Sequence, residues 1–140
     1  MTDKFRADAQ ILKVAPELGL IFGWAVVCKV DGEYFYDSDN EAVTEQCMLE
    51  FSTEFAKSKR TACAMHARDA TGQPVPDGGV IHTFPLTTEI AAALDITTKR
   101  TGLLVALAPD DPETLEKARR GEYTGFSIGG SIIEFEEDEA

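Results

Sequence analysis

LGLIFGWAVVCKVDGEYFY, residues Leu18–Tyr36, is the stretch that decides the class of fold. β-Branched and aromatic side chains fill its first part, and its glycines make it a poor helix. We therefore expect one long strand over Leu18–Val30, bent at Gly23. The pair Asp31–Gly32 is a strong hairpin signal, so the chain turns back into a second strand over Glu33–Tyr36.

Outward from this hairpin, strands and helices follow one another irregularly. Strands are expected at Gln10–Val14, Val80–Phe84, Gly102–Ala108, Phe126–Ile128 and Ser131–Phe135, with a short apolar segment at Thr61–Met65. Helices are expected over Glu41–Ser58, from Thr87 to about Leu94 and from Pro112 to about Arg120. Glycines and prolines make Ala67–Gly79 a long loop. The pattern is a β-rich α+β one, and a mainly antiparallel β-barrel or sheet surrounded by about three helices fits it best.

The first helix has the clearest pattern of the three. Its apolar positions recur at a spacing of four, with a methionine beside them: Val43, Cys47, Met48, Phe51 and Phe55. This spacing predicts one buried stripe on an amphipathic helix. Asp39 and Asn40 precede it and are expected to cap its N-terminus.

Composition bounds the function. The 140-residue chain has a formal net charge of −12 and is 44% hydrophobic, which fits one domain over residues 1–135 with an acidic, disordered tail at residues 136–140. The lack of a basic cluster argues against nucleic-acid binding, and the acidity argues against an anionic membrane surface. The start of the chain does not resemble a secretory signal, and no apolar run is long enough to span a bilayer.

Metal and cofactor sites are not expected. The three cysteines, Cys28, Cys47 and Cys63, form no CxxC pair, and we interpret them as reduced, buried thiols of a cytoplasmic protein. There are only two histidines, and no metal-binding motif includes them. The glycine-rich run GFSIGG lacks the lysine of a phosphate-binding loop.

A nucleophilic serine is the remaining chemical hypothesis. Gly125–Gly129, GFSIG, matches the GxSxG pattern with Ser127 at its centre. In a hydrolase elbow this motif joins a strand to a helix, whereas a strand is expected to follow it here. Ser127 also has a plain interpretation as a small residue in a tight backbone. By the same reasoning His66 is a partly buried histidine, and His82 alternates with Val80 and Phe84 on one strand face.

Several stretches together resemble the prohead proteases of tailed bacteriophages. They are LGLIFGWAVVCKVDGEYFYD at Leu18–Asp37, AMHARD around His66, GGVIHTFPLTTEIAAALDI at Gly78–Ile96, and TGLLVALAPDDPETLEKARRGEYTGFSIGG at Thr101–Gly130. They cover nearly the whole chain in the same order as in that family. The resemblance implies the fold of the herpesvirus assembly proteases, which is a β-barrel ringed by helices.

The resemblance also implies a serine endopeptidase that cleaves scaffold and major capsid proteins inside the assembling procapsid, in the host bacterial cytoplasm. It matches Ser127 to the nucleophile and His66 to the general base. His82 is the preferred third member, and Glu134 and Asp69 are the alternatives. Backbone N–H groups near Ile128–Gly130 are the candidate oxyanion donors. No cofactor, nucleic acid or membrane is implied, and a homodimer is expected by analogy with the herpesvirus enzymes.

Two other functions compete with this one. A catalytically silent domain of the same fold would bind capsid or scaffold protein and would be free to lose Ser127 or His66. A small-molecule esterase would use the same two residues without the elbow context. The presence of both residues favours the endopeptidase.

Overall fold

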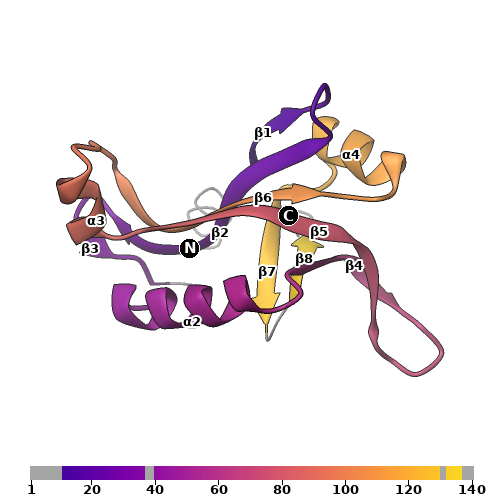
Figure 1. Ribbon diagram of the computed structural model, residues 1–140, viewed down its shortest axis with the longest axis horizontal. Helices are drawn as coiled ribbons and strands as arrows, with labels where there is room; N and C mark the ends of the chain where they lie inside the picture. The colour runs from indigo at the N-terminus through magenta and orange to yellow at the C-terminus, as the bar shows by residue number, and fades with distance from the viewer. Residues whose placement is uncertain (1–10, 37–39, 130–131, 137–140) are drawn as a thin grey trace.

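The computed structural model describes residues 11–36, 40–129 and 132–136. In these ranges eight strands form one sheet, with three helices packed on it (Figure 1). The strands are β1 (Ile11–Ala15), β2 (Leu20–Val30), β3 (Glu33–Tyr34), β4 (Thr61–Arg68), β5 (Pro74–Leu86), β6 (Arg100–Ala108), β7 (Gly125–Gly129) and β8 (Ile132–Glu136). The helices are α2 (Glu45–Lys57), α3 (Thr88–Ala93) and α4 (Pro112–Arg119).

The sheet is mainly antiparallel, as expected. Its strand order is β1-β2-β6-β5-β4-β8-β7, with β3 paired to β2 beyond this path. Only the β4–β8 pair among the described strands is parallel. The sheet is not closed into a barrel, although one backbone hydrogen bond of 2.6 Å, from Ile11 N to Thr124 O, bridges its two ends.

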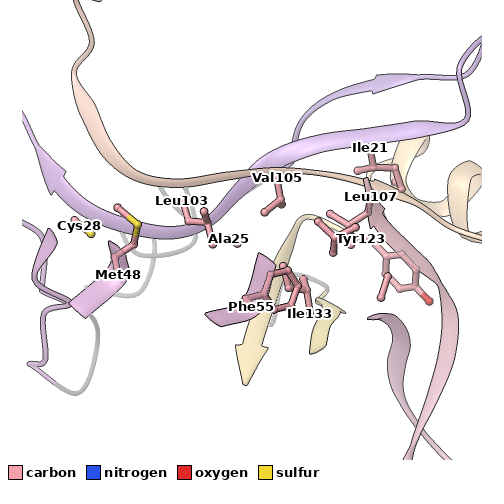
Figure 2. Packing of buried hydrophobic residues seen from close by; sticks show 13 residues of the cluster. Ile21, Ala25, Cys28, Met48, Phe55, Leu103, Val105, Leu107, Tyr123 and Ile133 are labelled. Carbon is pink, nitrogen blue, oxygen red and sulfur yellow. The ribbon is translucent and has the colours of Figure 1, made fainter. Parts of the chain in front are cut away.

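The core lies beneath β2 and β6. Leu103, Val105 and Leu107 alternate on one face of β6, and all three are buried there. Figure 2 shows these side chains facing Phe55 of α2 and Ile133 of β8. The other face of the sheet is covered at one end by a second cluster, in which α3 packs against residues of β2 and β5. Side chains on both faces of β6 are therefore shielded from solvent.

The β2–β3 hairpin forms where the sequence predicts it. Asp31 and Gly32 both adopt positive φ angles, 53° and 85°, as a two-residue turn of type I′ requires. The bend of β2 differs from expectation, because its register against β6 shifts between Trp24 and Val26 and again between Val27 and Lys29 rather than at Gly23. β-Bulges of this kind bend a strand. The irregular pairing does depend on a glycine of the partner strand, because Gly102 has a φ of +152° and a Cβ there would lie 2.0 Å from Val26 O.

Helix α2 begins later than predicted. Thr44 caps it by accepting a hydrogen bond from Cys47 N, so Asn40 is not the cap, and Asp39 lies outside the described residues. Its buried residues are Met48, Ser52 and Phe55, while Cys47 is exposed. The predicted stripe is confirmed for Met48, Phe51 and Phe55, which pack in the core. It is wrong for Val43, which precedes the helix, and for Cys47, because steps of four residues drift by about 40° each around a helix of 3.6 residues per turn.

The two shorter helices begin close to where the sequence predicts. Thr87 caps α3, and Asp111 followed by Pro112 begins α4, which ends before Gly121. In the part of the chain that the structure describes, no helix is both long enough and apolar enough to cross a membrane.

The predicted loop at Ala67–Gly79 is wrong. β4 continues to Arg68 and β5 begins at Pro74, so the two strands form a long hairpin that projects from the sheet (Figure 1). Prolines at Pro74 and Pro76 are tolerated here because the hairpin pairing is irregular, with register shifts on both sides of Cys63.

A β-bulge in β5 fixes this strand to the start of α4. Asp77 is buried, and its Oδ1 accepts hydrogen bonds of 2.9 Å from both Asp110 N and Asp111 N, while its Oδ2 accepts one from the Thr114 hydroxyl. Gly78 follows at φ +84°, and a Cβ there would lie 1.9 Å from Ala108 O. The bulge therefore requires glycine at position 78.

Gly78→Ala should lower the free energy of unfolding by more than about 3 kcal/mol, because it combines a left-handed backbone with a clash against main chain. Gly72 is a matched control, since it has the same φ of +84° and nothing within 4 Å of a Cβ. Gly72→Ala should cost only about 1–2 kcal/mol. Urea denaturation of both variants measures the difference, and equal losses would contradict the account of the bulge.

The cysteines should differ in reactivity. Cys28 and Cys63 are buried and Cys47 is exposed, so only two of the three match the predicted buried thiols. Burial, reinforced by the nearby Glu45 charge, raises the pKa of the Cys28 thiol to about 12. Iodoacetamide at neutral pH should therefore alkylate Cys47 first, as mass spectrometry of tryptic peptides will show. Modification of Cys28 at the same rate as Cys47 would contradict this packing.

Candidate functional site

Three adjacent strands carry the two residues that the resemblance matches to a catalytic pair. β8 lies between β7, which holds Ser127, and β4, which holds His66. Glu134 of β8 is aligned with Ser127 on one side and with Cys63 on the other. Ser127, Glu134 and Cys63 thus form one row across the sheet. As the sequence predicts, a strand and not a helix follows the GFSIG motif.

His66 is near this row but not in it. It lies three positions beyond Cys63 on β4, in a stretch where the β4–β5 register is irregular. The strand order therefore brings His66 and Ser127 to the same end of the sheet, two strands apart and offset along the strand. The side chains of Ser127, His66 and Glu134, together with Gly130 of the expected oxyanion segment, lie outside the described residues.

His82 is placed elsewhere. From the aligned pair Thr61 and Gly79, His66 lies five positions along β4, whereas His82 lies three positions along the antiparallel β5, which runs the other way. The two histidines are thus separated by roughly 25 Å of strand, at about 3.3 Å per residue. The register does not bring His82 to His66.

The predicted shared face is confirmed for His82 and Phe84, which are both exposed, but it is wrong for Val80. The register of β5 against β6 shifts between Val80 and His82, which leaves Ile81 as the extra residue of a bulge. Val80 is 3% exposed and belongs to the core, whereas His82 is exposed to solvent. Alternation in the sequence cannot predict this, because a bulge interrupts the two-residue period.

Asp69 organises the turn of the β4–β5 hairpin. Its Oδ1 accepts hydrogen bonds from Thr71 N at 2.9 Å, from the Thr71 hydroxyl at 2.7 Å and from Gln73 N at 3.0 Å. The Thr71 hydroxyl, followed by the backbone N–H groups of Gln73 and Thr71, lowers the pKa of the Asp69 carboxyl. This carboxylate acts on its own turn, in the manner of an Asx-turn.

A second polar cluster joins β2, α2 and α3, and the sequence analysis did not predict it. Glu45 Oε2 accepts hydrogen bonds of 2.9 Å from both the N–H and the hydroxyl of Thr88, which lies 43 residues away in the chain. Lys29 Nζ donates to the Thr88 hydroxyl at 3.2 Å and lies 3.7 Å from Glu45 Oε1. No local motif connects these residues, so only the fold shows the cluster.

The charge on Glu45 is stabilised by this cluster. Burial disfavours the charged carboxylate, but the hydroxyls of Thr101 and Thr88, the Thr88 N–H and the Lys29 ammonium outweigh it, and the pKa of Glu45 lies below its ordinary value. The Thr101 hydroxyl is near enough to contribute to this shift, although its geometry is not that of a hydrogen bond.

Comparison of the chain with models of known protein families, with curated proteins and with solved structures finds no match.

Thr71→Val should raise the pKa of Asp69 toward its ordinary value, because it removes the largest single stabilisation of the carboxylate and keeps the Thr71 N–H. In the wild type the turn should keep its contacts until the pH falls through this lowered pKa, since protonation then weakens the accepted hydrogen bonds. NMR titration of the Asp69 side chain measures both values. Thr53→Val, in α2, is the control that should leave Asp69 unchanged; an unaltered Asp69 pKa in Thr71→Val would disprove the assignment.

Proposed function

We propose that this chain is a serine endopeptidase that processes major capsid and scaffold proteins of a tailed bacteriophage, within the procapsid assembling in the host bacterial cytoplasm. The proposal rests on the resemblance to prohead proteases. The structural observation that supports it is the strand order, because β8 is the one strand between β7, which contains Ser127, and β4, which contains His66. Ser127 is the nucleophile and His66 the general base.

In this mechanism His66 removes the proton of the Ser127 hydroxyl as the oxygen attacks a peptide carbonyl. Backbone N–H groups near Ile128–Gly130 stabilise the resulting oxyanion. His66 then gives its proton to the leaving amine, which breaks the peptide bond and leaves an acyl-enzyme. Water, deprotonated by His66, hydrolyses that ester and restores Ser127.

The strand register favours Glu134 over His82 as the group that orients His66. Glu134 lies on the strand next to β4, aligned with Cys63 and hence three positions from His66, whereas His82 is eight positions away along the strands. Asp69 is less suitable because its carboxylate already accepts three hydrogen bonds in its own turn. A carboxylate would also stabilise the imidazolium more than a neutral histidine does.

We also propose that the sheet closes into a barrel of the herpesvirus-protease type. The Ile11 N to Thr124 O hydrogen bond, together with contacts between β7 and β2, brings the two ends of the sheet near each other. A small movement of β7 toward β2 would complete the closure. A homodimer, as in the herpesvirus enzymes, is part of the same analogy.

A catalytically silent capsid-binding domain is the second candidate function. One observation favours it, which is the three-position offset of His66 from the row that contains Ser127. If His66 keeps this offset along β4 in solution, its ring stays beyond hydrogen-bonding distance of the Ser127 hydroxyl.

The test is cleavage of co-expressed capsid and scaffold proteins. Ser127→Ala and His66→Ala should each reduce cleavage by at least about a thousandfold, because each removes one half of the nucleophile–base pair. Glu134→Gln should reduce it by a smaller factor, and His82→Ala should leave it within about twofold of wild type because His82 is remote from the row.

Labelling with a fluorophosphonate probe separates the competing functions. Labelling that disappears in Ser127→Ala, accompanied by peptide cleavage, supports the endopeptidase. Labelling without peptide cleavage indicates an esterase, and absence of labelling in a folded wild-type protein indicates the silent domain. Normal cleavage by Ser127→Ala would overturn the assignment of the nucleophile.

A further inference from the structure

A cavity of about 290 Å³ lies beside α3, at the end of the sheet where β2 meets β6. Its walls come from β2, the β2–β3 turn, α3, the segment after α3 and the start of β6. The lining residues are Lys29, Gly32, Thr88, Ala91, Ala92, Ile96, Thr97, Thr98, Lys99 and Thr101. Its volume is at the lower limit of ligand sites, which indicates a small ligand.

The charged residues that line the cavity are both basic. Among the residues that the structure describes, Lys29 and Lys99 border the cavity and no acidic residue does, in a chain whose net charge is −12. Ala91, Ala92 and Ile96 supply apolar lining to the same cavity. The combination suits a molecule with an anionic end and a short apolar body.

Lys29 retains hydrogen-bonding capacity for such a ligand. Its ammonium has three N–H donors and uses one on the Thr88 hydroxyl, while Glu45 Oε1 at 3.7 Å is beyond hydrogen-bond distance. Glu45 does not depend on Lys29, because Thr88 already donates two hydrogen bonds to it. Lys29 can therefore turn toward the cavity without leaving an unpaired carboxylate behind.

Thr101 gives independent support. This residue is 8% exposed, lines the cavity and is aligned with Lys29 in the β2–β6 register. Its buried hydroxyl has no hydrogen-bond partner in the described part of the chain. An unpaired buried hydroxyl is costly and calls for an explanation.

We propose that this cavity binds a small apolar carboxylate, either a free acid or the C-terminus of a peptide, with its carboxylate on Lys29 and its chain against Ala91, Ala92 and Ile96. A carboxylate fits better than a phosphate, because Glu45 offsets one of the two lysine charges and no arginine of the described ranges lines the cavity. The site is separate from Ser127 and does not depend on the proposed peptidase activity.

NMR titration with hexanoate tests the proposal. We expect shifts at Ile96–Lys99 and a Kd on the order of 1 mM, as suits so few ligand atoms. 1-Hexanol should bind at least about tenfold more weakly, because it lacks the charge that Lys29 contacts. Lys29→Gln should weaken hexanoate binding about tenfold, and Ala92→Leu should block it by filling the cavity. Lys13→Gln, on β1, is the matched control and should change nothing.

Two further ligands distinguish the sources of the carboxylate. Binding of N-acetyl-Ala-Ala-Ile with a free C-terminus, but not of its C-terminal amide, would assign the site to peptide ends; binding of hexanoate alone would assign it to free acids. The proposal is overturned if neither acid binds at about 10 mM. It is also overturned if hexanoate binds equally well to the folded Lys29→Gln and Ala92→Leu variants.

Discussion

Burial of both faces of β6 is the constraint on which the rest of the structure depends. Leu103, Val105 and Leu107 face one cluster and Leu104 faces the other, so neither face tolerates water. A strand of this kind must be central and must be covered on each side. β2 and β5 flank it, α2 and β8 cover one face, and α3 covers part of the other. The candidate site and the lysine-lined cavity are both built around that arrangement.

Bulges adapt the long strands to this packing. Each bulge adds one residue to one strand of a pair and reverses which side chains face the core beyond it. In β5 the shift at Ile81 separates Val80 from His82, and the bulge at Asp77–Gly78 directs a carboxylate to the start of α4. These irregularities decide which polar residues meet. His82 lies away from His66 for a different reason, because β5 runs antiparallel to β4 from their aligned pair Thr61 and Gly79.

Part of the candidate site could be predicted from the sequence. The chemical types at Ser127 and His66, and the strand that follows GFSIG, were readable from the sequence. Which candidate third residue lies nearer to His66 in the sheet was not, because sequence order places His82 nearer than Glu134, whereas the parallel pairing of β4 with β8 does the reverse. Pairing between strands about seventy residues apart leaves no local signal. The cluster of Lys29, Glu45 and Thr88 was missed for the same reason.

The sequence by itself determined the local features: the Asp31–Gly32 hairpin, the starts of α3 and α4, the strand at Gly102–Ala108 and the mainly antiparallel α+β class. These depend on backbone propensity and short-range hydrogen bonds, which neighbouring residues specify. Only the tertiary structure decided the extent of the β4–β5 hairpin, the buried face of α2, the strand order and the position of every bulge. These depend on which distant surfaces exclude water together, and that is a property of the assembled core.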